Sequence, residues 1–175
     1  MDMELSEEQL MLRDMVRKFA GAEVAPGAGL RDETGEYPWD LMKRLAELNL
    51  LGIIIPEEYG GAGLDYVSYA IVIEELSRHD AALGMTVSAH NSLSTFQIYK
   101  YGHEGLRRRY VVPLAKGEVM GAWALTEPNA GSDAGSMETT ARLENGRWVI
   151  NGRKAFTTNG SVAGTYVIMA STDRK

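Results

Sequence analysis

Two helical stretches that are apolar on nearly every side constrain this chain more than any other feature. They cover residues 66–77 and 81–101, where apolar residues recur at helical spacing without leaving a polar face. A helix of this kind cannot expose its whole surface to water, so other helices have to cover it. The sequence therefore predicts a helical bundle with these two helices at its centre.

A capping box marks the start of the first covering helix. The Ser6 side chain can accept a hydrogen bond from the Gln9 amide while the Gln9 side chain reaches back. An apolar stripe follows at helical spacing and stops before Pro26, a residue that breaks helices. We therefore expect the first helix to span roughly residues 6–23.

Proline, glycine and aspartate set the expected limits of the remaining helices. Pro38 suits the first turn of a second covering helix, and Gly52 is expected to stop it. Asp65 can cap the first of the two central helices. A short basic helix over residues 104–112 is expected to end at Pro113.

The last third of the sequence favours strands. Thr139–Leu143 and Arg147–Asn151 flank Asn145-Gly146, which is typical of a two-residue type I′ hairpin turn. Further strands are expected over residues 119–126 and 165–171. Strands are thus confined to the part of the chain that follows the helices.

These elements predict an α+β fold. We expect an all-α N-terminal helical domain over residues 1–118, followed by the first part of an antiparallel β domain over residues 119–175. The β domain is expected to be incomplete, because only four or five strands fit into its length.

Composition argues against several classes of function. There is no cysteine, which removes disulfides, thiolate metal sites and cysteine nucleophiles. Eighteen Lys and Arg against 24 Asp and Glu give a net charge of −6, so neither nucleic acid nor an anionic membrane is an expected partner. The acidic start lacks the features of a signal peptide, and no apolar stretch approaches the ~20 residues that cross a bilayer. We expect a cytoplasmic protein.

The three histidines are too scattered to predict a metal site. They stand at His79, His90 and His103, and no carboxylate or cysteine pattern of ligand spacing accompanies them. His90 falls in one of the apolar helices, where an interior histidine with its hydrogen bonds satisfied is the expected state. No metal is therefore predicted.

The densest group of chemically distinctive residues is a strand and turn over residues 123–135, WALTEPNAGSDAG. It brings hydroxyls, free amides and a glycine turn to a sheet edge, where they can bind an anion or a polar ring edge. The same residues suit a plain capped turn, and the physical reasoning leaves both interpretations open. Glu127 precedes a proline at this turn, so we expect it to hold backbone amides or pair with a cation, not to act as a base.

This strand and turn resembles the signature of the acyl-CoA dehydrogenase family. Three further stretches agree with it in the family's order: residues 56–63 (PEEYGGAG), 74–78 (EELSR) and 151–160 (NGRKAFTTNG). Residues 88–93 and 98–102 look most like short-chain, butyryl-CoA-type members. The resemblance covers the whole chain and implies an FAD-dependent oxidation of an acyl-CoA to a trans-2-enoyl-CoA.

The resemblance implies two segments that surround the isoalloxazine of FAD. In the first, the backbone of Leu125 and Thr126 and the Thr126 hydroxyl meet the pyrimidine edge, and Ser132 contacts the cofactor or the acyl-CoA thioester. In the second, Phe156 lies against the ring and Thr158 hydrogen-bonds near N5. The expected cofactor-binding residues are Trp123, Leu125, Thr126, Gly131, Ser132, Phe156, Thr157 and Thr158, and Ser132 is also expected at the substrate.

The second segment departs from the family pattern at two positions. Many relatives have tryptophan, an apolar residue, threonine and asparagine in a row, where this chain has Phe156, Thr157, Thr158 and Asn159. Phenylalanine keeps a stacking surface but loses the indole donor. Thr158, like Thr126, is also β-branched and suits a strand, so a purely structural role is the alternative for both.

The family's reaction also needs groups that we do not expect in this sequence. In relatives, the glutamate that removes the α-proton comes from a C-terminal helical domain, which is expected to be absent here, so no catalytic residue is assigned. The family implies an acyl-CoA substrate, an electron-transferring flavoprotein as acceptor, and a homotetramer. Two alternatives stay open: a non-catalytic relative that binds flavin or acyl-CoA, and a flavin oxidase of the same fold.

Overall fold

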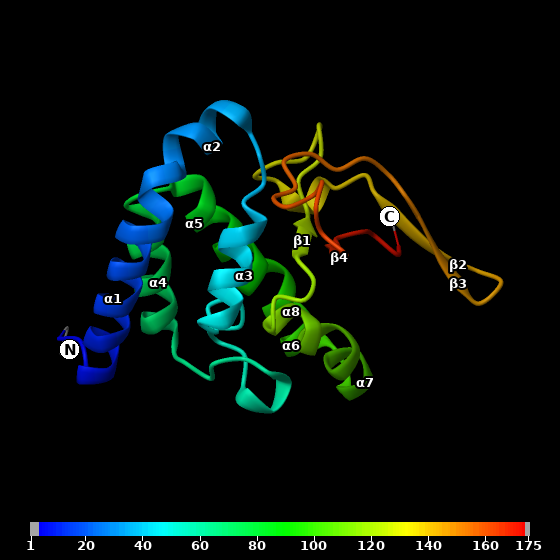
Figure 1. Ribbon diagram of the computed structural model, residues 1–175. Coiled ribbons are helices and arrows are strands. Elements are labelled where there is room, and N and C mark those ends of the chain that lie inside the picture. Colours follow the sequence, from blue (N-terminus) through cyan, green and yellow to red (C-terminus); the bar gives the residue numbers. More distant parts are fainter. Residues whose placement is uncertain (1–3, 174–175) are drawn as a thin grey trace.

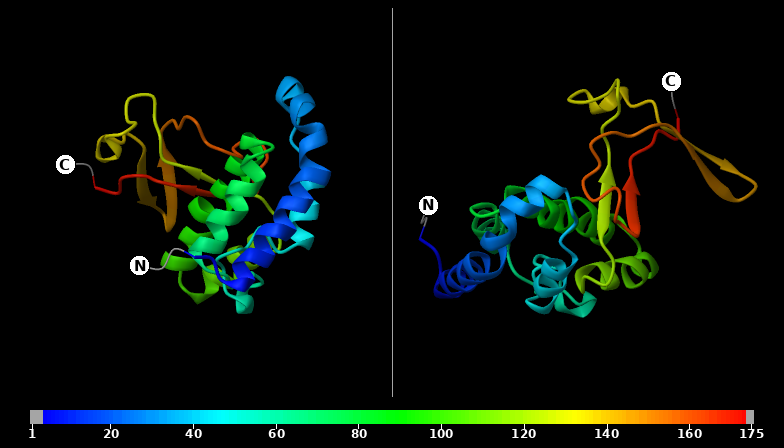
Figure 2. Two further views of the ribbon diagram at one scale, coloured as in Figure 1. Left: turned by 90° about the vertical axis from the view of Figure 1, so that its left-hand side faces the viewer. Right: turned by 45° about the horizontal axis from the view of Figure 1, so that its top comes forward.

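The helices and the strands of this chain lie side by side, with the strands at one end of the molecule (Figure 1). The computed structural model describes residues 4–173, so the expectations for residues 1–3 and 174–175 fall outside it. Within that range every helix of four or more residues precedes every strand, which confirms the α+β order. The further views in Figure 2 show the same separation.

The elements have the following bounds. The α-helices are α1 (Glu7–Phe19), α2 (Ala28–Thr34), α3 (Trp39–Glu47), α4 (Tyr66–Ser77), α5 (Ala81–Ser88), α6 (Phe96–Tyr101), α7 (Glu104–Leu106) and α8 (Val112–Ala115). The strands are β1 (Gly121–Ala124), β2 (Thr140–Glu144), β3 (Arg147–Asn151) and β4 (Thr165–Ile168).

Helices α4 and α5 take the central place that their sequence predicts. Helix α4 packs between α1 and α5, and the π-helical continuation of α5 packs against β1. The largest buried cluster gathers side chains from α1, α3, α4 and α5, from the turn after α1, from the loop after α3, and from Met120 just before β1. It includes Val16, Val24, Leu45, Leu51, Ile53, Val72, Leu76, Leu83, Val87 and Met120, each at most 2% exposed.

The expected helix over residues 81–101 is continuous but changes its pitch. A π-helical segment, Ala89–Thr95, joins α5 to α6. Inside it the His90 carbonyl accepts hydrogen bonds from the hydroxyls of Ser94 and Thr95, at 2.8 and 2.7 Å. Side-chain hydroxyls that bind a carbonyl compete with the regular backbone ladder, which accounts for the wider turn at this point.

Two prolines do not end helices where the sequence analysis placed the ends. The path of α1 continues through a π-turn at Ala20–Val24 and a 3₁₀ turn at Ala25–Gly27 into α2, and it stops only at Gly35. Likewise Pro113 lies in the first turn of α8. At the start of a new helical segment a proline nitrogen needs no hydrogen-bond partner, so the chain passes both prolines without a break.

Helix α3 ends at Glu47, before a turn at Asn49, and does not continue to Gly52. Asn49 takes the left-handed conformation, with φ of 57°. This conformation commonly follows the last turn of a helix, and asparagine tolerates it better than most residues. Gly52 has a different purpose, because a Cβ there would lie 2.8 Å from the Ala115 Cβ and 3.0 Å from the Gly61 Cα. Gly52 thus lets the backbone approach both the end of α8 and the loop at Gly61.

The predicted helix caps are confirmed. The Gln9 N–H donates to the Ser6 hydroxyl at 3.2 Å, and the Ser6 N–H donates to the Gln9 side chain at 3.1 Å. Asp65 accepts from the Ser68 N–H at 2.7 Å, which caps α4. The Gln9 amide also donates to Asp65 at 2.9 Å, so the caps of α1 and α4 are joined.

The strands form two separate pairs. Strands β2 and β3 are antiparallel, and Asn145 and Gly146 between them have φ of 51° and 76°, which confirms the type I′ turn. Strands β1 and β4, by contrast, are parallel, with Gly121 opposite Thr165 (Figure 2). The chain between them is long enough for the crossover that parallel strands require, and the sequence pattern did not indicate it.

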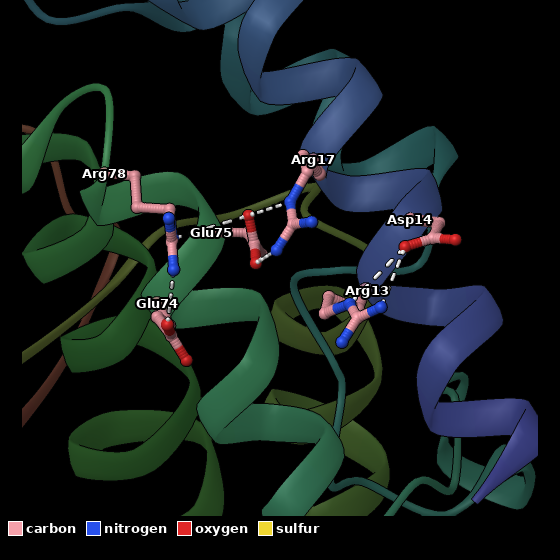
Figure 3. A network of polar contacts seen from close by, with 6 residues as sticks. All are labelled: Arg13, Asp14, Arg17, Glu74, Glu75 and Arg78. Atoms are coloured by element: carbon pink, nitrogen blue, oxygen red, sulfur yellow. Dashed lines mark hydrogen bonds and ion pairs between the residues drawn. The ribbon is translucent and has the colours of Figure 1, made fainter. Parts of the chain in front are cut away.

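A buried carboxylate holds α1 against α4. Glu75 is 1% exposed, and its two oxygens accept from Nη2 and Nε of Arg17 at 2.7 and 3.0 Å (Figure 3). The hydrogen bond from Arg17 is the main reason that the pKa of Glu75 is lowered. On the solvent side of α4, Glu74 pairs with Arg78 at 3.0 Å.

The substitution Glu75→Gln tests this contact. We expect it to lower the free energy of unfolding at pH 7 by about 1–2 kcal/mol, because a buried two-pronged pair is replaced by a weaker contact. Because the pKa of Glu75 is lowered in the folded protein, the difference in unfolding free energy between wild type and variant is present above the unfolded pKa of about 4.3. It shrinks as the pH falls below that value. Urea unfolding measures it, with the exposed neighbour Glu74→Gln as control; equal effects of the two variants would contradict the assignment.

Candidate functional site

The two segments singled out in the sequence lie side by side. The Ala155 N–H donates to the Thr126 carbonyl at 2.8 Å. The Lys154 ammonium donates to the Leu125 carbonyl at 2.9 Å and to Glu127 at 2.7 Å. Residues 125–127 of the first segment are therefore joined to residues 154–155 of the second by three hydrogen bonds.

Glu127 is the buried centre of this junction. Its carboxylate is 2% exposed and also accepts from the backbone N–H groups of Glu138 and Thr139, at 2.5 and 3.0 Å. The hydrogen bond from Lys154 is the largest cause that lowers the pKa of Glu127 to about 2. A carboxylate that is ionised and fully engaged in this way is a poor general base, as the sequence analysis expected.

The predicted residues next to the junction are at least partly exposed. The Phe156 side chain is 94% exposed, and its backbone has a φ of 52°, which is rare for an aromatic residue. In residues 4–173, none of the hydrogen bonds involves the hydroxyl of Thr126 or Thr158. Three further predicted residues are partly exposed, namely Trp123, Leu125 and Thr157.

These features fit a flavin ring, which is apolar on its faces and polar along its rim. An exposed aromatic side chain offers area for ring packing, and hydroxyls without a protein partner can donate to or accept from ring nitrogens and oxygens. The carbonyls of Leu125 and Thr126 already accept from the second segment. The Thr126 hydroxyl is thus a polar group of this segment that remains for a ligand.

Gly131 and Ser132 lie on the turn that follows. Reciprocal backbone hydrogen bonds of 2.9 and 3.2 Å between Glu127 and Ala130 close this turn. Both Gly131 and Ser132 are exposed, and within the described residues no hydrogen bond joins them to the second segment. A hydrogen bond therefore joins Thr126 to Ala155, whereas none among the described residues joins Gly131 or Ser132 to the second segment.

His90 connects the helices to β1 from the interior. It is fully buried, its Nδ1 lies 3.0 Å from the Gly121 nitrogen, and its Nε2 lies 3.0 Å from the Leu114 carbonyl oxygen. An amide N–H can only donate, so Nδ1 accepts and Nε2 carries the proton. Burial lowers the pKa of His90 to about 4, which keeps the ring neutral. The expected interior histidine is confirmed.

Asn159 is the residue of this region that the sequence analysis did not single out. It is 8% exposed, and its amide nitrogen donates to the carbonyls of Thr86 and Gly121, both at 3.2 Å. The available signal was an asparagine before a glycine, which is typical of the left-handed conformation that it adopts, with φ of 63°. That signal says nothing about the two carbonyls.

The basic run Arg107–Arg109 lies in the π-turn after α7, and two of its arginines contact other parts of the protein. The Arg108 guanidinium lies 4.6 Å from the ring centre of Tyr59 and donates to Glu104 at 2.7 Å. The Arg107 guanidinium lies 5.3 Å from the ring centre of Tyr99. Two of the arginines in this basic run are thus stacked on tyrosines.

Two searches of the described part of the chain complete the description of the site. Among residues 4–173, no three His, Cys, Asp or Glu side chains are grouped so that they could hold a metal ion. Helices in that same range are all too short or too polar to cross a membrane.

Comparison with known proteins decides the family. Residues 6–118 match the acyl-CoA dehydrogenase N-terminal domain, and residues 122–175 match the acyl-CoA dehydrogenase middle domain. The chain belongs to the acyl-CoA dehydrogenase family. The resemblance noted in the sequence is therefore confirmed, in the order helical domain and then β domain.

Individual acyl-CoA dehydrogenases match along nearly the whole chain. The short-chain specific enzyme of Clostridium acetobutylicum is 49% identical over 174 residues, which are 99% of this chain and 46% of that protein. The structure of butyryl-CoA dehydrogenase from Megasphaera elsdenii is 37% identical with a TM-score of 0.93, covering 99% of this chain and 46% of that one. An acyl-CoA dehydrogenase of Bacillus anthracis complexed with FAD is 38% identical with a TM-score of 0.90, covering 97% and 29%. The chain spans about half the length of the curated acyl-CoA dehydrogenases it matches.

The Glu127 junction predicts a distinctive dependence on pH. Glu127→Gln removes the charge that Lys154 and two backbone amides hold, so we expect a lower urea midpoint at pH 7. Because the pKa of Glu127 is lower in the folded protein than in the unfolded chain, its ionised carboxylate stabilises the fold at pH values above the unfolded pKa of about 4.3. This stabilisation is lost as the pH falls toward the folded pKa of about 2. The gap between wild type and variant should therefore close over that range. Glu144→Gln, on the exposed hairpin, is the control, and a gap that persists at low pH would refute the junction.

Proposed function

We propose that the protein carrying this chain is an FAD-dependent acyl-CoA dehydrogenase that acts on a short-chain acyl-CoA. The observation that supports the proposal is the junction at Thr126 and Ala155, where a backbone hydrogen bond joins the two family segments. The names of the relatives support the substrate class, since they include a short-chain specific enzyme and a butyryl-CoA dehydrogenase. The FAD complex of the Bacillus anthracis relative supports the cofactor.

The residues of the site have distinct roles in this proposal. Trp123 and Phe156 supply apolar area against the ring, and the Thr126 hydroxyl binds its pyrimidine edge. The Thr158 hydroxyl would hold the edge of FAD near N5, and the bound cofactor would supply the hydride acceptor for the reaction. Gly131 and Ser132, on the exposed turn, bind the outer edge of the cofactor or the thioester. Leu125 and Thr157, whose carbonyls already accept hydrogen bonds from Lys154 and Gly160, line the site beside these residues.

Proton removal belongs to a group outside these residues. The α-proton needs a carboxylate beside it, and Glu127 is held by Lys154 and two amides, so it does not serve. We propose that the base is a glutamate elsewhere in the complete protein, as in the family. An electron-transferring flavoprotein as acceptor and a homotetrameric assembly follow from the same family resemblance.

The domain division follows the change from helices to strands. Helix α8 ends at Ala115 and β1 begins at Gly121, so a boundary near residue 118 is the proposed division between domains 1–118 and 119–175. The chain after the boundary supplies the flavin segments, and the chain before it supplies the His90 and Thr86 contacts that support them.

The complete protein should purify yellow and lose its colour when butyryl-CoA is added without oxygen, because FAD is reduced as the substrate is oxidised. Absorbance near the flavin band measures both properties. A preparation that stays colourless and takes up no added FAD would refute the proposal. Retained colour without bleaching by acyl-CoA of any length would favour the non-catalytic relative, and rapid recolouring in air would favour the flavin oxidase.

Thr158→Ala should slow flavin reduction by butyryl-CoA about tenfold or weaken FAD retention by the same factor, because one hydrogen bond at the ring is lost. Far-UV circular dichroism should not change, since the Thr158 hydroxyl has no protein partner among the described residues. Thr172→Ala, at an exposed position outside both segments, is the matched control. Unchanged FAD content and reduction rate would show that Thr158 is misplaced.

A further inference from the structure

Gly121, the first residue of β1, is held by side chains on both of its polar backbone groups. Its N–H donates to His90 Nδ1 at 3.0 Å, and its carbonyl accepts from the Asn159 amide at 3.2 Å. Both side chains are buried, His90 at 0% and Asn159 at 8% exposure. Backbone groups at a strand end commonly pair with a neighbouring strand, so two buried side-chain partners on one residue are a specific arrangement.

The same residue has no room for a side chain. A Cβ on Gly121 would lie 2.1 Å from the Ser94 hydroxyl and 2.8 Å from its Cβ, both in the π-helical segment after α5. The start of β1 is thus fixed against the helices at backbone distance. Trp123 and Thr126 follow within five residues, so this contact also sets where the first flavin segment lies.

Asn159 fixes the second flavin segment to the same point. It follows Thr158 directly, and its backbone φ of 63° turns the chain there. Its amide nitrogen has two hydrogens, and each meets one carbonyl, that of Gly121 on β1 and that of Thr86 on α5. The opposite orientation of the amide would place its oxygen against both carbonyls, so the network assigns the nitrogen to this side.

We propose that Asn159 is a positioning residue for the flavin site. Its carboxamide binds the start of β1 and α5, and so holds the neighbouring Thr158 at a fixed place relative to both. His90 holds the start of β1 from the helical side through the Gly121 N–H. This inference rests on the proposed function, because it assigns what orients Thr126 and Thr158 toward a flavin. Asn159 itself does not touch the reacting atoms.

Asn159→Gly tests the contribution of the side chain while it keeps the backbone conformation of the turn. Glycine adopts a φ of 63° freely, so the turn is preserved while both carboxamide hydrogen bonds are lost. In the complete protein we expect the Kd for FAD to rise about tenfold or more, which two lost hydrogen bonds can cause. The visible spectrum of the remaining bound flavin should also shift, because the polar groups at its rim are displaced.

Asn145→Gly is the matched control. Asn145 is also left-handed, with φ of 51°, but it lies exposed at the tip of the β2–β3 hairpin (Figure 1). We expect wild-type FAD affinity and spectrum in this variant. The two variants undergo the same chemical change in the same backbone conformation, so their difference reports the carboxamide contacts.

Asn159→Asp is the second test, since it keeps the shape but turns an oxygen toward two carbonyls. FAD titration by fluorescence quenching, on protein taken from the folded peak of a gel-filtration column, should show a loss at least as large as for Asn159→Gly. Wild-type Kd and flavin spectrum in both Asn159 variants would overturn the positioning role, even if their thermal stability fell. Failure of the wild type to bind FAD would instead overturn the proposed function, and this assignment with it.

Discussion

The buried carboxylate of Glu127 is the group on which the β part of this chain depends. It gathers an ammonium and two backbone amides, and the same ammonium binds the Leu125 carbonyl. A buried charge is stable only when hydrogen-bonding partners surround it, so the segments that supply these partners have to lie together. Ala155 then meets Thr126, and two stretches far apart in the sequence become one surface.

The helices could be predicted where the signals are local. The caps at Ser6 and Asp65 and the Asn145-Gly146 turn each need only residues a few positions apart, and all were found as predicted. The helix ends at Pro26 and Pro113 were wrong, because a proline at the start of a new segment costs the backbone nothing. The parallel pairing of β1 with β4 was not foreseen, since strand direction depends on which partner lies adjacent and not on either strand's pattern.

The site shows the same division between local and distant causes. Glu127 before a proline correctly suggested an amide-binding carboxylate, yet Lys154 as its partner lies 27 positions away. The meeting of the two segments was expected only through the family resemblance, because nothing in their spacing indicates it. Asn159 was missed for a similar reason, since its partners lie 38 and 73 positions earlier in the chain. A side chain that joins three elements leaves no periodic trace in the sequence.

Parallel pairing of β1 with β4 also has a consequence for the order of folding. During synthesis, β1 leaves the ribosome before the residues of β4. The N–H and C=O groups of β1 that pair with β4 therefore lack this partner until β4 has been made. His90, by contrast, precedes Gly121 in the chain, so the acceptor for the hydrogen bond from the Gly121 N–H is synthesised before Gly121 itself. The helical part therefore carries a hydrogen-bond partner for the start of β1 that precedes β4 in the order of synthesis.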